Sequence, residues 1–143
     1  MVYNDTLKRE IPEGWEVENL ANNKLTTILK PGIDKFENEK IYLPTAAITD
    51  DKITDRSNII SYENRESRAN MQPISNSVWF AKMKGSNKKL IITHTDDDLI
   101  QQYILSTGFQ GILASNRLPL SLITAIVISD DFTVQRDLNS VGT

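Results

Sequence analysis

The fold is set by the segment Ser77-Val-Trp-Phe-Ala-Lys-Met-Lys-Gly-Ser-Asn-Lys-Lys-Leu-Ile-Ile-Thr-His-Thr, residues 77–95. Its two ends are rich in β-branched and aromatic residues, which is typical of strands. Gly85 and Asn87 lie between them, and both residue types suit the backbone of a hairpin turn. The segment therefore predicts an antiparallel hairpin of strands 77–83 and 89–95.

The flanking segments predict shorter elements. The apolar run 41–48 contains Pro44, so it fits an edge or bulged strand, and Asp50-Asp51-Lys52 predicts a turn. Asp96-Asp97-Asp98 predicts an acidic turn, and residues 99–113 mix strand and turn because two glycines interrupt a β-rich stretch.

The last third of the chain allows two interpretations. Residues 122–128 are β-branched and fit a buried strand, whereas Leu118, Leu122 and Ile126 behind Pro119 also fit a helix. Ser129 is suited to cap a helix over residues 130–139, because its hydroxyl can accept a terminal N–H and two aspartates follow it.

Length and composition describe one ordinary globular domain. The chain has 143 residues, of which 39% are hydrophobic and 24% charged, so disorder and a chain dominated by membrane spans are excluded. It contains no cysteine, which excludes disulfides and thiolate chemistry and suits a reducing compartment. No signal peptide or apolar run of membrane-spanning length is present, so we expect a cytoplasmic protein without a membrane partner.

The charges are unevenly distributed. The net charge is −3, yet residues 24–89 carry 12 basic and 8 acidic residues, a local charge of +4. Residues 1–23 carry 2 basic and 5 acidic residues, and residues 90–143 carry 2 and 6. The positive charge therefore lies in the middle of the chain, where an anionic partner would bind.

Motifs for catalysis or cofactors are missing. No nucleotide-binding glycine loop and no Gly-x-Ser-x-Gly elbow occurs, so we expect no cofactor and no catalytic residue. The single histidine, His94, precedes the acidic run 96–98, which raises the alternative of a small metal-dependent hydrolase. Three consecutive carboxylates point in alternating directions, however, and more often form a solvated turn.

Two basic groups are the candidate binding residues. Lys82, Lys84, Lys88 and Lys89 surround the hairpin turn, where they would contact phosphates or, alternatively, protect a strand edge from pairing. The second group is polar, lies before the hairpin, and could read base edges or form a salt-bridged loop with Glu63 and Glu66. Its members are Arg56, Asn64, Arg65, Arg68 and Asn70.

Four segments, in order, resemble one family. The first is Glu10-Ile-Pro-Glu-Gly-Trp-Glu-Val-Glu-Asn-Leu, in which Trp15, Val17 and Leu20 are apolar anchors. The second is Ser67-Arg-Ala-Asn-Met-Gln-Pro with the strand from Ser77, and the third is Tyr103-Ile-Leu-Ser-Thr-Gly-Phe-Gln-Gly. The fourth is Ser129-Asp-Asp-Phe-Thr-Val-Gln-Arg-Asp-Leu-Asn-Ser-Val-Gly-Thr. Together they resemble a target recognition domain from the DNA-specificity subunit of Type I restriction–modification systems. The resemblance extends over nearly the whole chain.

The resemblance implies an α+β fold with a twisted, largely antiparallel sheet and a few helices, and it favours helix for 122–128. It implies that residues 1–143 are one recognition domain, ending before the helical spacer that follows in the family. Its partners would be double-stranded DNA, of which it reads one half of a split site, and the methyltransferase and restriction subunits that perform the chemistry. A third hypothesis is a protein-interaction module anchored by Trp15, Trp79 and Phe80.

Overall fold

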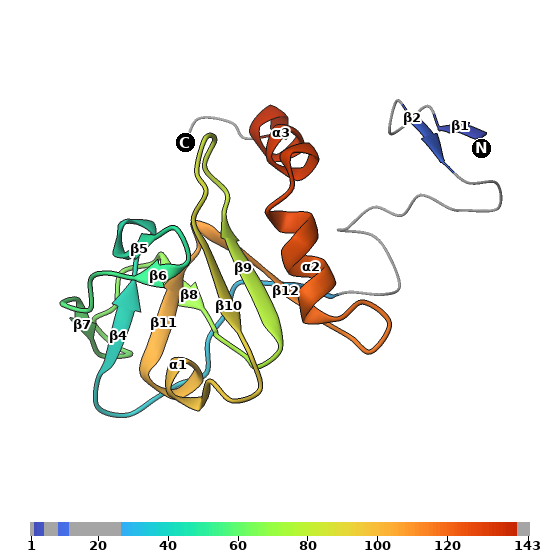
Figure 1. Cartoon of the computed structure of the whole chain (residues 1–143). Helices are drawn as coiled ribbons and strands as arrows, with labels where there is room; N and C mark the ends of the chain where they lie inside the picture. The colour runs from blue at the N-terminus through green and yellow to red at the C-terminus, as the bar shows by residue number, and fades with distance from the viewer. Residues whose placement is uncertain (1, 5–8, 12–26, 140–143) are drawn as a thin grey trace.

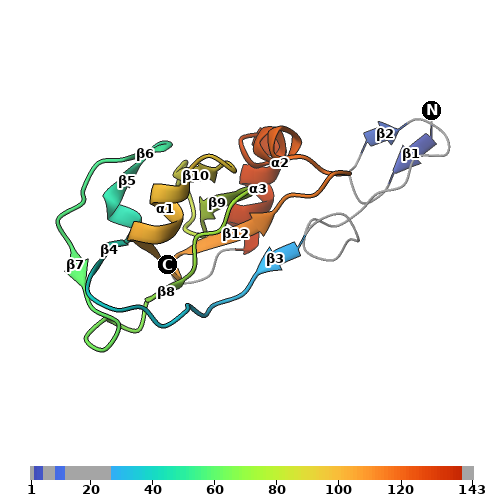
Figure 2. The same cartoon turned by 90° about the horizontal axis from the view of Figure 1, so that it is seen from below.

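Two four-stranded sheets pack face to face, and two helices cover the outer face of one of them (Figure 1). The computed structural model describes residues 2–4, 9–11 and 27–139. The predicted α+β fold with largely antiparallel strands is confirmed; two four-stranded sheets hold most of the strands, and β1-β2 and β5-β6 form two-stranded sheets. Figure 2 shows α2 and α3 beside β9 and β12, with β4, β5 and β7 gathered at the opposite end.

The helix-covered sheet has the strand order β10-β9-β12-β3, and all its neighbouring strands are antiparallel. Its strands are β3 (Thr27–Leu29), β9 (Ser77–Ala81), β10 (Lys89–Ile92) and β12 (Phe109–Leu113). The predicted hairpin is confirmed as β9 and β10, with Trp79 opposite Leu90. Gly85 in its turn has φ +77°, a conformation that favours glycine.

The loop-bearing sheet has the strand order β7-β4-β11-β8, in which β4 and β11 are parallel. Its strands are β4 (Lys40–Leu43), β7 (Ile59–Ile60), β8 (Ala69–Met71) and β11 (Tyr103–Ser106). The remaining elements are β1 (Val2–Asn4), β2 (Arg9–Ile11), a 3-10 turn (Thr45–Ala47), β5 (Ile48–Thr49), β6 (Lys52–Ile53), α1 (Asp97–Gln102), α2 (Leu120–Val127) and α3 (Asp130–Asn139).

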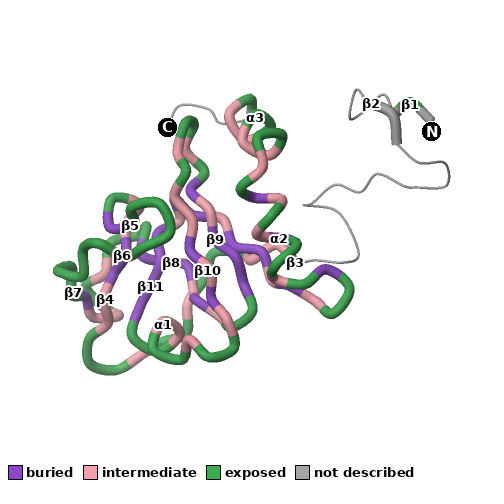
Figure 3. Tube along the Cα trace, in the orientation of Figure 1, coloured by how far each residue is buried: buried purple, intermediate pink, exposed green. Residues whose placement is uncertain are grey.

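The core between the sheets is centred on Trp79, whose side chain is fully buried. Its indole N–H donates to the Ser77 hydroxyl (2.9 Å), so the one polar atom of the ring is satisfied. Gly111 lies opposite Trp79 on β12, and a Cβ atom there would be 2.7 Å from the ring. The second glycine of Ser-Thr-Gly-Phe-Gln-Gly is therefore required by the close approach of the indole. Figure 3 shows the buried stretches along β9, β11 and β12.

The ambiguous run 122–128 forms helix α2, as the family resemblance implied. Ile123 and Val127, four residues apart, are buried against Val78 and Ile112 of the sheet. The predicted helix over 130–139 is confirmed as α3, and the Phe132 amide donates to the Ser129 hydroxyl (3.2 Å) as predicted for an N-cap.

The local predictions for residues 41–48 and 96–98 are wrong, and residues 99–102, predicted to mix strand and turn, belong to helix α1. Residues 41–48 form no single edge strand: β4 ends before Pro44, a 3-10 turn follows, and β4 lies inside its sheet between β7 and β11. Asp97 and Asp98 open helix α1, with Asp96 at its N-cap, where carboxylates favour the positive end of the helix dipole. The predicted turn at Asp50 and Asp51 is confirmed between β5 and β6.

The expected domain opening at residues 12–20 and the closing glycine-threonine turn at 142–143 lie outside the described residues. No helix in the described part of the chain has the length and apolar character needed to cross a membrane.

Candidate nucleic-acid interface

The two basic groups meet at the turn formed by residues 106–108, hereafter the 106–108 turn. The Thr107 amide donates to the carbonyl of Arg68 (2.9 Å), and the Lys82 amide donates to the carbonyl of Gly108 (2.9 Å). Inside the turn, the Gly108 amide donates to the buried hydroxyl of Ser106 (3.0 Å). The turn thus joins the loop at residues 61–68, hereafter loop 61–68, to the chain leaving β9.

Gly108 provides the space in which these segments come together. A Cβ atom at this position would lie 2.8 Å from the methyl group of Thr45 and 2.9 Å from a guanidinium nitrogen of Arg68. The Lys88 ammonium donates to the Thr45 carbonyl (2.7 Å), so the hairpin reaches the same place from the other side. Arg68, Lys82 and Lys88 are therefore the predicted residues that the structure brings together.

Loop 61–68 is held by Arg65. Its guanidinium donates to the carbonyls of Ala69 (3.1 Å) and Tyr62 (2.6 Å), and it stacks 4.1 Å from the centre of the Tyr62 ring. The Tyr62 ring in turn packs edge-on against Phe36, at 5.8 Å between ring centres. These contacts make Arg65 an internal support of the loop.

Asn64 gives the loop a second internal support. The Ser61 backbone amide donates to the Asn64 side-chain oxygen (2.9 Å), and the Asn64 backbone amide donates to the Ser61 hydroxyl (3.3 Å). This reciprocal pair closes a short turn that precedes Arg65. The polar loop predicted here is confirmed, and its shape comes from its own side chains.

Arg68 is exposed, and no hydrogen bond or ion pair joins its guanidinium to the residues that the structure describes. Beneath it lies Tyr42, whose side chain is nearly completely buried. Burial raises the pKa of the Tyr42 phenol, the hydroxyl of Ser106 opposes that rise, and the nearby carboxylate of Glu66 adds to it. Arg68 and Glu66 therefore both lie near the Tyr42 phenol, with opposite effects on its pKa.

The hairpin lysines differ in what they contact. Lys88 is half-buried and bound to Thr45, and the Lys89 ammonium donates to the nearby carbonyl of Asn87 (2.9 Å). Lys82 and Lys84 are exposed. Of the four, Lys82 and Lys84 therefore have the accessibility that phosphate contacts require.

The hairpin tip is fastened to α3. The Gly85 amide donates to the Asp137 carboxylate (3.0 Å), and Arg136 donates to the Ser86 carbonyl and forms an ion pair with Asp137 (2.9 Å). The Gly85 amide, and then the Arg136 side chain, hold the pKa of Asp137 below its usual value. A cavity of about 60 Å³ lies beside this contact, which is room for a few water molecules only.

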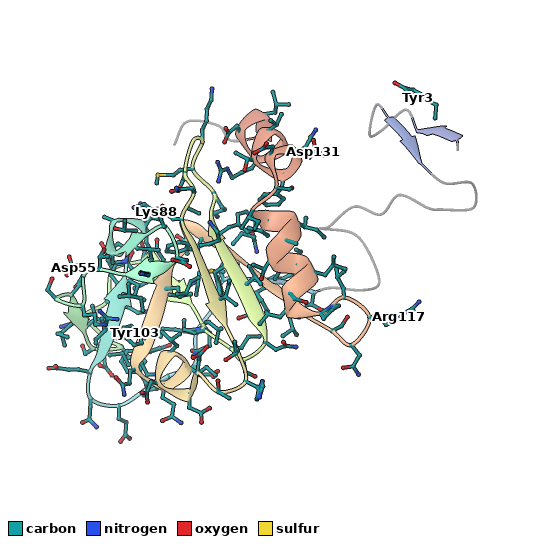
Figure 4. All side chains as sticks on the ribbon, viewed as in Figure 1. Tyr3, Asp55, Lys88, Tyr103, Arg117 and Asp131 are labelled. Atoms are coloured by element: carbon teal, nitrogen blue, oxygen red, sulfur yellow. The ribbon has the colours of Figure 1, made fainter. Side chains whose placement is uncertain are left out.

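Arg56 lies apart from the 106–108 turn, whereas Asn70 follows Ala69, which pairs with Ser106. Arg56 donates to the Tyr103 hydroxyl (3.0 Å) at the opposite end of β11, and Asn70 is half-buried within strand β8 instead of lying in the loop. Figure 4 shows Tyr103 well separated from Lys88, and Arg117 on the far side of the molecule.

The alternative sites receive no geometric support. His94, predicted in a strand, is exposed in the turn after β10, and Asp96 is occupied by bonds from the Thr93 amide and hydroxyl (2.8 and 2.9 Å). Within the described ranges, no three histidine or carboxylate side chains gather as metal ligands. Trp79 is buried in the core and Phe80 packs against Phe132, so neither is available as a protein-binding anchor; Trp15 lies outside the described residues.

The 106–108 turn was not among the site residues predicted from the sequence. The signal was present in Ser106-Thr-Gly-Phe, which belongs to a segment that resembles the family. A serine and a glycine at the end of a buried strand indicate a tight turn with a close approach.

No family model and no curated protein matches this sequence. Among solved structures, it is similar to the HsdS subunit from Thermoanaerobacter tengcongensis, with 28% identity and a TM-score of 0.56 over 68% of this chain and 25% of that one. It is also similar to a chain from a structure on complex assembly and conformational transition of the type I R-M system, with 22% identity and a TM-score of 0.67 over 94% of this chain and 34% of that one. The chain therefore spans between a quarter and about a third of the length of these neighbours.

The fold is that of a target recognition domain, an α+β unit of two packed sheets with helices on one side. One structural neighbour is an HsdS subunit, and the other is a chain from a type I R-M system that shares the fold. The resemblance found in the sequence is confirmed.

Proposed function

We propose that this chain recognises one half of a bipartite DNA target for a Type I restriction–modification complex. The observation that carries the proposal is the similarity to an HsdS subunit over 68% of the chain. The meeting of two basic groups at the 106–108 turn supports it, because the arrangement offers charge for phosphates next to side chains that can contact bases.

The net negative charge is compatible with this role. Binding depends on the electrostatic field at the interface. Acidic residues more than a Debye length away, about 8 Å at physiological salt, are largely screened from a bound phosphate. Lys82 and Lys84 are exposed, and lysine carries a point charge on a long stem that suits phosphate, so we assign them phosphate contacts. The domain contributes selection of sequence, and the methyltransferase and restriction subunits that it directs perform the reactions.

A direct test measures how duplex binding depends on salt. Each lost phosphate contact lowers the log–log slope by about one unit. The full chain and its Lys84→Ala variant are titrated with a random-sequence duplex by fluorescence anisotropy at several salt concentrations. Lys84→Ala is expected to weaken binding to all sequences and to flatten the slope.

The matched control is Arg117→Ala, which removes one exposed charge from the loop before α2 (Figure 4). This variant should keep the wild-type slope. Equal slopes for the wild type and Lys84→Ala would remove Lys84 from the interface, and absence of any salt-dependent duplex binding by the wild type would refute the proposed function.

A further inference from the structure

We propose that Arg68 is the base-reading residue of this interface, that its ligand is a guanine in the major groove, that Gly108 positions its side chain, and that Arg65 and Asn64 support the loop that precedes it. The inference rests on the proposed function and makes it more specific. It divides one sequence-predicted group, which contains Asn64, Arg65 and Arg68, into residues that contact DNA and residues that shape the protein.

The first step concerns the hydrogen-bonding capacity that each side chain has left. Arg65 already donates to two main-chain carbonyls and has one face covered by the Tyr62 ring. These bonds use two of its five N–H donors, and moving the guanidinium outward to a base would break them and release the loop. Asn64 is occupied too: its side-chain oxygen accepts the Ser61 amide, whereas paired recognition of adenine requires both the oxygen and the nitrogen of the amide.

Arg68 has the opposite arrangement, a fixed backbone and an available side chain. Its carbonyl accepts two amides, those of Asn70 and Thr107, both at 2.9 Å. The residue is exposed, one guanidinium nitrogen lies close to Gly108, and the guanidinium has no hydrogen-bond partner in the described part of the chain. A side chain on a fixed backbone loses less entropy on binding than one on a mobile loop.

The surroundings favour a base over a phosphate as the ligand of Arg68. The carboxylate of Glu66 is exposed and acts, like Arg68, on the Tyr42 phenol below. Glu66 lies two residues before Arg68, and a negative charge in this neighbourhood opposes a second negative charge such as a phosphate. It is compatible with a G·C pair, since the arginine fork matches O6 and N7 of guanine and a carboxylate can accept from the cytosine amino group.

Gly108 is the most sensitive positioning residue. Its φ lies outside the left-handed region, so alanine would not strain the backbone there. The added methyl group would instead occupy the place of the Arg68 guanidinium nitrogen and of the Thr45 methyl group. Gly108→Ala should therefore displace Arg68 while leaving its charge on the surface.

The test begins with selection of binding sites from random duplexes by the full wild-type chain, followed by affinity measurements on the selected duplex and on duplexes with one base pair changed. Arg68→Ala should lower discrimination at one G·C position by about 5- to 150-fold, the usual range for one bidentate pair. Arg68→Lys keeps the charge and removes the fork. It should bind random duplex like the wild type and still lose discrimination at that position.

Arg65→Lys and Asn64→Ala are the matched controls, because support of the loop and reading of a base give different results. They should weaken binding to selected and random duplexes alike, keep the preferred sequence, and speed amide hydrogen exchange in loop 61–68. Gly108→Ala should lose discrimination as Arg68→Lys does. Since Arg68 is exposed, its variants should keep the wild-type thermal midpoint, which separates lost recognition from lost folding.

Two results would overturn the inference. If both Arg68 variants keep the wild-type preference at every position, or if Arg65→Lys changes the preferred sequence, another residue reads the bases while the proposed DNA-binding function stands. If the wild type selects no sequence and shows no salt-dependent affinity for duplex DNA, the proposed function fails and the assignment of Arg68 fails with it.

Discussion

The hairpin β9–β10 and loop 61–68 both carry positive charge toward the 106–108 turn, but they are made rigid in different ways. The hairpin is held from outside: Lys88 binds the Thr45 carbonyl, and Asp137 and Arg136 of α3 bind the tip. The loop is held from within by Arg65 and Asn64. Basic residues near a binding surface therefore serve two purposes, and their hydrogen bonds distinguish those that support the surface from those that present charge.

The difference has a physical basis in the neighbouring elements. A hairpin has its own cross-strand hydrogen bonds, and only its tip needs contacts with another element to be fixed. A loop between two short strands has no such ladder, so its carbonyls need side-chain donors. Arginine suits this task because one planar group reaches two carbonyls and stacks on a ring.

The largest effect on stability is expected from Trp79→Ala, which tests whether the helix-covered sheet supports both the hairpin β9–β10 and loop 61–68. The indole is fully buried and covers Gly111, so its removal leaves a large cavity, and we expect a loss of about 3–5 kcal/mol in the free energy of unfolding. Urea denaturation followed by circular dichroism measures it. Ile59→Ala on the exposed side of β7 is the control and should cost far less; equal losses would contradict the central role of Trp79.

A smaller effect is expected from Lys88→Ala, which tests whether this lysine supports the hairpin. The variant removes a charged donor from the part-buried Thr45 carbonyl, and we expect a loss of about 1–2 kcal/mol in the free energy of unfolding. Lys84→Ala removes the same charge from the exposed tip and should change stability by less than about 0.5 kcal/mol. Thermal or urea unfolding of the two variants side by side checks the difference. If Lys88→Ala is as stable as Lys84→Ala, the bond to Thr45 contributes nothing and Lys88 is a surface charge.

The sequence predicted the hairpin and α3 because their signals are local. A β-rich pair around Gly85, and a serine before two aspartates, act within a few residues of the structure that they specify. Pro44 was misinterpreted as a mark of an edge strand. It ends β4 instead, and the position of β4 inside its sheet comes from parallel pairing with β11, which lies far along the chain.

The candidate residues were predicted as two groups with one role for each group, and the sequence did not separate the members within a group. Arg68 and Lys82 meet only because β11 pairs with β8 and β12 pairs with β9, and no local pattern contains both pairings. Whether an arginine binds a carbonyl of its own loop or is free for a ligand depends on where the carbonyls lie, so Arg65 and Arg68 look alike in the sequence. Gly108 was visible in the sequence. Its close approach to Thr45 and Arg68 could be seen only in the folded structure.

The smallest effect concerns the ionised form of Asp137, which fastens the hairpin tip to α3. The Gly85 amide and then the Arg136 side chain lower its pKa from the ordinary 3.8, so the folded state favours the carboxylate. A lowered pKa contributes stability above the ordinary value and loses it as pH falls through the folded value. Asp137→Asn lacks this titration. The wild type should have a higher free energy of unfolding than Asp137→Asn. This difference should be constant near neutral pH and should shrink below pH 3.8.

Urea unfolding of both proteins across the acid range measures this difference. The control is Asp51→Asn, which changes an exposed carboxylate of the β5–β6 turn. A difference that grows as the pH falls would contradict the role of the ionised carboxylate, and because this group is partly exposed the effect should also weaken in high salt.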